Sequence, residues 1–217
     1  MGSEFLTYLR LGFAHIADLA GFDHILFVAA LTGGYALSAW RRLLWLVTAF
    51  TLGHTVTLAL ATFRLVTIDA GLIEVLIPAT ILATAALAIV QARRPDEARP
   101  WRRAGWRGAD DGPRGGALYV VAACFGLIHG LGFSTYLRAL LGAESSLVLP
   151  LVGFNVGLEI GQLLIVAATL LVGGLFVRVL GFARRDWMLL LAGATGGLAL
   201  MLLLQRIAAL RGGPGVP

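Results

Sequence analysis

The feature of this chain that most constrains its fold is a series of long apolar segments that recurs along nearly its whole length. Of its 217 residues, 59% are hydrophobic and 13% are charged, about half the charged share of an ordinary soluble domain. A segment of about 18 or more apolar residues can cross the hydrocarbon core of a bilayer as a helix. The sequence therefore predicts a single all-α transmembrane domain over residues 1–217, with no segment left for a separate soluble domain.

Six segments are long and apolar enough to be predicted as spanning helices. They cover residues 22–39, 43–63, 70–92, 116–141, 147–177 and 186–209. The N-terminal segment, residues 1–20, is more polar because it carries Arg10, His15 and Asp18. We expect an amphipathic or half-inserted helix there, and the sequence leaves open whether residues 5–20 cross the membrane. Residues 211–217 are predicted to be a flexible tail.

The longest polar segment is residues 93–115, in which seven arginines and four acidic residues accompany proline and glycine. Loops rich in arginine face the cytoplasm, so this segment is predicted to be a cytoplasmic loop. The arginines at positions 41, 42, 178, 184 and 185 fall in loops predicted on the same side. Membrane orientation thus explains the net charge of +5, and we do not expect nucleic-acid binding.

All four histidines of the chain lie in or beside apolar segments rather than in the polar loop. A strongly polar side chain inside a bilayer costs a few kcal/mol on insertion scales, so such groups usually face a partner, a cavity or a translocated ion. Imidazoles together with carboxylates suit nickel, cobalt, zinc or ferrous iron. The candidate set consists of His15, His24, His54, His129, Asp18, Asp23, Glu74 and Glu159. We hypothesise that these side chains converge on one divalent metal ion.

Helix packing and hydrolysis are the alternative roles for these polar residues. Interhelical hydrogen bonds alone could account for one or two buried polar groups, and Asn155, Glu159 and Gln162 share one helix face at i, i+4 and i+7. A hydrolytic enzyme is disfavoured, because Ser134 follows His129 without a GxSxG or HExxH motif. Cys124 is alone, so thiolate ligation and a cuprous ion are disfavoured as well.

Glycines are concentrated beside the polar residues. Gly153, Gly157 and Gly161 repeat every four residues, a pattern that favours close packing of two helices. Around His129, three glycines (Gly126, Gly130 and Gly132) are compatible either with close packing or with a loosened helix whose carbonyls face a cavity.

Five ordered motifs resemble the HupE/UreJ family of membrane proteins. They are GFDHILF at 21–27, TAFTLGHTVTLALA at 48–61, IEVLIPATI at 73–81, FGLIHGLGFS at 125–134 and FNVGLEIGQL at 154–163. The resemblance covers residues 11–205 and implies a bacterial inner-membrane permease of six or seven helices, linked in parts of the family to nickel or cobalt supply. The family's polar signature falls on His15, Asp23, His24, His54, Glu74, His129, Asn155, Glu159 and Gln162.

The expected function is transport of a divalent metal ion, nickel or cobalt first and zinc or ferrous iron as alternatives, with no permanent cofactor. Asp23, His24 and Glu74 are expected to capture the ion at the outer face and pass it to His54, His129 and Glu159. Asn155, Gln162 and Asp18 are expected to lie along the path or to orient the ligands. The alternative is a non-transporting subunit of a larger membrane complex, and a membrane partner or a homo-oligomer is compatible with either function.

Overall fold

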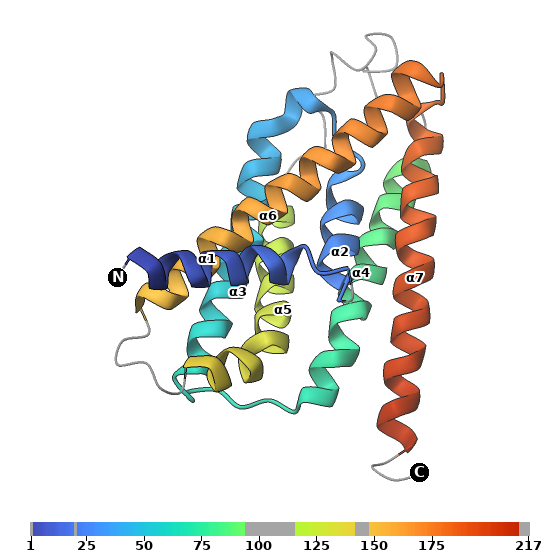
Figure 1. Cartoon of the computed structure of the whole chain (residues 1–217). Helices are drawn as coiled ribbons and strands as arrows, with labels where there is room; N and C mark the ends of the chain where they lie inside the picture. The colour runs from blue at the N-terminus through green and yellow to red at the C-terminus, as the bar shows by residue number, and fades with distance from the viewer. Residues whose placement is uncertain (1, 20, 94–115, 142–147, 213–217) are drawn as a thin grey trace.

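The computed structural model describes residues 2–19, 21–93, 116–141 and 148–212, and all regular structure in them is helical. Seven α-helices follow one another along these residues (Figure 1). They are α1 (Gly2–Ile16), α2 (Asp23–Thr32), α3 (Trp40–Thr62), α4 (Ala70–Arg93), α5 (Ala117–Leu141), α6 (Val148–Gly174) and α7 (Arg184–Gly212). A 3-10 turn at Leu37–Ala39 precedes α3, and a π-helical stretch at Leu175–Val179 follows α6.

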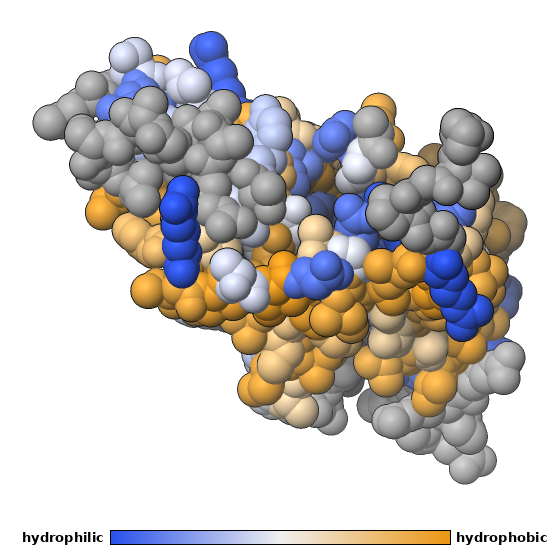
Figure 2. Space-filling model, turned by 90° about the horizontal axis from the view of Figure 1, so that it is seen from below, coloured by the Kyte–Doolittle hydropathy of each residue, from blue (hydrophilic) through white to orange (hydrophobic). Residues whose placement is uncertain are grey.

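Five of these helices, α3 to α7, are long and apolar enough to cross a membrane. Large aliphatic side chains cover their outer surface, and Leu52, Leu171 and Leu204 are 61%, 72% and 58% exposed. Figure 2, which views the bundle from below, shows a broad hydrophobic flank with hydrophilic residues gathered beside it. Such a flank is stable in contact with lipid, so the chain is a multi-pass membrane protein.

The predicted spanning helix at residues 22–39 differs most from the structure. Only the ten residues Asp23–Thr32 form α2, half the number that a spanning helix needs. Gly33 and Gly34 follow, and their carbonyls accept hydrogen bonds from the Trp187 indole and the Arg184 guanidinium. These side chains satisfy carbonyls that the end of the helix leaves unpaired. Six spanning helices are therefore not confirmed.

The N-terminal helix α1 lies across α6, as Figure 1 shows. Its buried side is formed by Tyr8, Gly12 and Ile16. A Cβ atom added at Gly12 would meet the carbonyl of Phe154, and one at Gly157 would meet the carbonyl of Leu9. The two backbones are thus in direct contact, and the predicted packing role of the α6 glycines is confirmed.

Helices α3 and α5 pack in parallel through a second set of glycines. A Cβ atom at Gly53 would meet the carbonyl of Ala123, and one at Gly126 would meet the carbonyl of Phe50. Gly130 lies equally close to the carbonyl of His54. Helix α5 continues without a break past His129, so these glycines serve packing rather than a loosened helix, and they bring the helices of His54 and His129 together.

Helices α4 and α7 form an antiparallel pair on the other side of the bundle. Gly196 of α7 lies against Ala85 of α4, and Gly71 of α4 lies against Leu210 near the end of α7. The short helix α2 contacts α4, α6 and α7, so its first residues reach the interior. Most of the predicted loop at 93–115 and of the predicted tail at 211–217 lies outside the described residues.

Candidate metal site

The four histidines come together although each belongs to a different helix: His15 to α1, His24 to α2, His54 to α3 and His129 to α5. The ring centroid of His24 lies 4.8 Å from that of His15, 5.9 Å from that of His54 and 5.0 Å from that of His129. The rings of His15 and His54 are 6.1 Å apart. His54 and His129 are fully buried and His24 is 6% exposed, so the cluster lies in the interior.

These separations can be compared with the geometry of metal coordination. A histidine nitrogen lies about 2.0–2.1 Å from a bound ion such as zinc, which places the ring centroid about 3.2 Å from the ion. Two imidazoles at angles of about 90–109° then have centroids about 4.5–5.2 Å apart, with an upper limit of about 6.4 Å. The rings of His15 and His129 lie 4.8 and 5.0 Å from that of His24, inside the range for these angles. The separations of His54 from His24 and His15, 5.9 and 6.1 Å, exceed that range and stay below the upper limit.

The ring nitrogens of the cluster are largely unpaired. His15 Nε2, His24 Nε2, His54 Nδ1 and Nε2, and His129 Nδ1 are buried and have no hydrogen-bond partner in the structure. Among the described residues, no three His, Cys, Asp or Glu side chains are arranged so that they could hold a metal ion. Three of these imidazoles can bind one ion only if some of them move from these positions.

Aromatic rings enclose the imidazoles. The Phe133 ring lies 3.8 Å from the ring of His15, centroid to centroid, and it stacks on Phe154. On the other side, Phe27 and Phe50 lie 5.1 and 5.2 Å from the ring of His129. These apolar neighbours exclude water from the imidazoles and offer their nitrogens no competing hydrogen bonds. A cation that entered the cluster would find nitrogen ligands in a region of low dielectric.

One histidine of the cluster has a polar partner on a neighbouring helix. The Nε2 atom of His129 lies 3.0 Å from the hydroxyl oxygen of Thr80 on α4. Thr80 is 5% exposed, so the contact is shielded from solvent. Thr80 is part of the IPAT sequence but was not among the predicted site residues, since its hydroxyl becomes informative only once α4 is placed beside α5.

The polar face of α6 is paired with threonines of α3. The hydroxyls of Thr48, Thr51 and Thr55 donate to Glu159 Oε1, Gln162 Oε1 and Asn155 Oδ1 at 2.7, 2.7 and 2.6 Å. These threonines occupy positions i, i+3 and i+7, so the sequence did contain a signal for them. Interhelical hydrogen bonding therefore accounts for one oxygen of each α6 side chain. The second oxygen of Glu159 is not part of this ladder.

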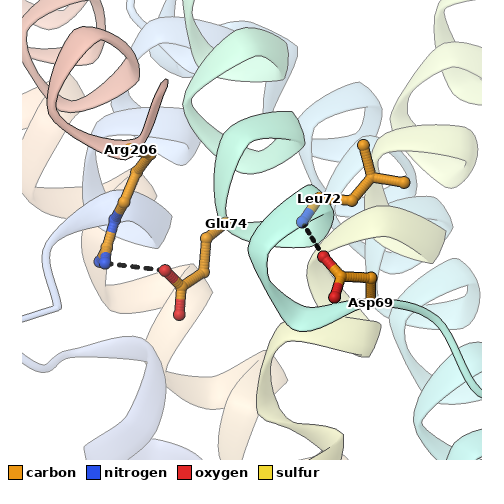
Figure 3. Close-up of polar contacts among 4 residues, drawn as sticks. All are labelled: Asp69, Leu72, Glu74 and Arg206. Carbon is orange, nitrogen blue, oxygen red and sulfur yellow. Dashed lines mark hydrogen bonds and ion pairs between the residues drawn. The ribbon is translucent and has the colours of Figure 1, made fainter. Parts of the chain in front are cut away.

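The remaining acidic candidates lie apart from the cluster centre. Glu74 Oε2 forms an ion pair of 2.9 Å with Arg206 Nη1 of α7 (Figure 3), and the two side chains are 51% and 46% exposed. Asp23 is half-buried at the start of α2, next to His24 in the chain. Burial raises the pKa of the Asp23 carboxyl above its ordinary value, and the positive charge of Arg206 opposes that shift. Asp18 is exposed beyond the end of α1.

Comparison with known proteins identifies the family of the chain. No curated protein and no solved structure matches it. The family model described as HupE / UreJ protein matches residues 1–206, which include all seven helices up to the last turns of α7 and every residue of the site. With its membrane-spanning bundle and its four converging histidines, the chain belongs to the HupE/UreJ family.

Proposed function

We propose that this protein is a permease for a divalent transition-metal cation, nickel or cobalt first, and that the cation is the transported substrate rather than a resident cofactor. Membership of the HupE/UreJ family supports metal handling. The donor set supports the class of ion, because imidazole nitrogen suits nickel, cobalt, zinc and ferrous iron. A bacterial inner membrane, with residues 93–115 in the cytoplasm, is the corresponding location.

The observation that carries the proposal is the group of buried, unpaired imidazole nitrogens. A buried polar group without a hydrogen bond costs about 1–3 kcal/mol, and the cluster contains several such atoms. Helix packing alone does not explain why several unpaired polar atoms are gathered in one cluster. A transient cation would satisfy these nitrogens by coordination.

A path through the protein follows from the order of the polar groups. Glu74 and Asp23 lie toward the end of the bundle where α4 begins and α7 ends, and Asp23 adjoins His24. We propose that the cation is captured there and reaches His54 and His129 through His24. Glu159 lies on α6, where Thr48 of α3 holds one of its oxygens. An inside-negative membrane potential would favour inward movement by about 2.3 kcal/mol per charge per 100 mV.

The test is uptake of radiolabelled nickel by cells that carry His54→Ala or His129→Ala. Each variant should lose most of the uptake of the parent, because each removes a nitrogen from the buried cluster. Cys124→Ala is the matched control, since Cys124 lies on α5 five residues before His129 but is exposed on the lipid side. If both histidine variants take up as much nickel as the parent at equal protein levels, transport through the cluster is contradicted. A non-transporting subunit of a larger membrane complex would then be the better explanation.

A further inference from the structure

The contact between Thr80 and His129 indicates which ring nitrogen of His129 carries a hydrogen. The Thr80 hydroxyl lies 2.7 Å from the backbone carbonyl of Ile77 and 3.0 Å from His129 Nε2. A carbonyl oxygen can only accept a hydrogen bond, and a hydroxyl has a single hydrogen to donate. If that hydrogen lies on the shorter contact, to Ile77, the Thr80 oxygen acts as acceptor toward the histidine. His129 Nε2 then carries a hydrogen.

This assignment determines what the other nitrogen of His129 can do. A neutral imidazole has one protonated and one unprotonated nitrogen. If Nε2 is the donor to Thr80, then Nδ1 carries the lone pair. That atom is buried and has no hydrogen-bond partner, and it belongs to the ring that lies 5.0 Å from the ring of His24. The lone pair is therefore available inside the cluster and is not engaged elsewhere.

We propose that Thr80 is a positioning residue: its hydroxyl oxygen holds His129 in the Nε2-protonated tautomer and leaves Nδ1 as the atom that binds the cation. The proposal rests on the proposed function. Groups that accept the second N–H of a ligating histidine fix both its tautomer and its ring orientation, and their loss costs about 10- to 100-fold in metal affinity. Thr80 does not touch the ion in this account and acts through His129.

A second buried threonine lies one turn after Thr80 on α4. Pro78 lies two residues before Thr80, and the backbone carbonyl of Thr80 accepts a hydrogen bond from the Thr84 hydroxyl at 2.8 Å. Thr80 and Thr84 are 5% and 6% exposed. Thr84 therefore resembles Thr80 in residue type, helix, burial and donation to a carbonyl of its own helix, whereas the contact with His129 is made by Thr80. The chain thus supplies a matched control.

The first experiment reads the tautomer without any metal. Nitrogen-15 NMR of histidine-labelled full-length protein in nanodiscs distinguishes protonated from unprotonated ring nitrogens, with His129→Ala identifying the His129 signals. The parent should show a protonated Nε2 and an unprotonated Nδ1 at His129. Thr80→Val should change this pattern, whereas Thr84→Val and Thr80→Ser should keep it. A parent with the hydrogen on Nδ1 would overturn the proposal.

The second experiment measures the dissociation constant for Ni²⁺ by calorimetry on the same proteins. Thr80→Val should bind about 10- to 100-fold more weakly, Thr80→Ser should recover at least most of the parent's affinity, and Thr84→Val should resemble the parent. Equal affinity of Thr80→Val and parent, with binding abolished in His129→Ala, would overturn the role of Thr80 and leave the proposed function standing. No nickel binding by the parent would instead refute the proposed function, while the NMR result would still decide the tautomer. If Thr80→Val does not fold, the parent's tautomer and the affinity of Thr80→Ser decide the matter.

Discussion

At the scale of single residues, the buried imidazoles differ from the other polar side chains of the bundle. Both ends of the Asn155 amide are paired, Oδ1 with the Thr55 hydroxyl and Nδ2 with the carbonyl of Leu151. By contrast, both ring nitrogens of His54 are unpaired. Gln162 is intermediate, because a threonine of α3 pairs its Oε1 while its Nε2 is buried without a partner among the described residues. Real proteins break the rule that buried polar groups are satisfied chiefly at functional sites. The contrast separates side chains that hold the helices together from side chains that are free to bind a ligand.

Glu159 has two proposed roles, because one of its oxygens pairs with Thr48 and its negative charge is available to a cation. A substitution can separate these roles. Glu159→Gln keeps an oxygen that can accept from Thr48, so the free energy of unfolding should change by less than about 1 kcal/mol. The substitution removes the negative charge, so nickel uptake should fall by about tenfold or more, because charge interactions are strong in a medium of low dielectric. Uptake and thermal unfolding of the same variant are the measurements. Unchanged uptake would confine Glu159 to helix packing.

Residues that position the histidines were the hardest to find from the sequence. The spacing of Asn155, Glu159 and Gln162 predicts a common face, but their threonine partners lie about 100 residues away in the chain. Thr80 gives no periodic signal of its own. Which polar residue meets which depends on the register between helices, and that register is set by glycine contacts that a single sequence does not specify.

At the scale of helices, the glycine contact between α3 and α5 determines how close His54 and His129 can come. Gly130→Ala should destabilise the protein by about 1–3 kcal/mol, the usual range for overpacking, because the added methyl group would meet the carbonyl of His54. Gly197→Ala on α7 is the control, since no atom lies within 4 Å of its added Cβ. We expect it to be neutral or slightly stabilising. Equal loss of stability in both variants, measured by thermal unfolding, would contradict this packing.

Helices α4 and α7 are joined at one end by the ion pair of Glu74 and Arg206 (Figure 3). An exposed ion pair contributes only about 0–1 kcal/mol, so Arg206→Gln should change stability little. It should nevertheless free Glu74 and remove a positive charge that acts on Asp23. The apparent affinity for Ni²⁺ at low salt should therefore rise by about two- to fivefold.

Arg211→Gln is the control for this prediction, because Arg211 is an exposed arginine five residues further along α7. The gain in affinity should shrink as salt screens the charges. Affinity of Arg206→Gln equal to that of Arg211→Gln at every salt concentration would exclude a role of the ion pair in cation capture.

The hydropathy of the sequence predicted the bounds of α3 to α7 closely, but it predicted a helix much longer than α2. The predicted bounds of 43–63, 70–92, 116–141, 147–177 and 186–209 agree with α3 to α7 to within a few residues. Residues 22–39 were predicted as one span because apolar residues continue past Thr32. The helix ends where Trp187 and Arg184 of α7 bind the carbonyls of Gly33 and Gly34, and a Cβ atom at Gly33 would meet the side chain of Leu191 of α7. The Gly-Gly pair was a visible signal, whereas the contact with α7 was not.

At the scale of the whole molecule, the site unites α1, α2, α3 and α5. A ligand that binds only this folded arrangement stabilises it by mass action, by about 2.7 kcal/mol at a concentration 100 times its dissociation constant. Ni²⁺ should therefore raise the temperature of unfolding of the parent, and the shift should disappear in His54→Ala. Mg²⁺ serves as the control cation, because it prefers oxygen ligands. An equal shift with Mg²⁺ would indicate binding to surface carboxylates instead.

The central claim is that the four imidazoles, brought from four helices, bind one divalent cation together. X-ray absorption spectroscopy of the nickel-loaded protein tests it most directly, because the scattering of imidazole rings reports how many histidines surround the metal. The parent should bind about one nickel ion per chain with several histidine ligands, and His24→Ala and His129→Ala should show fewer histidines or no bound nickel. Nickel surrounded only by oxygen atoms, with a spectrum that these substitutions leave unchanged, would contradict it.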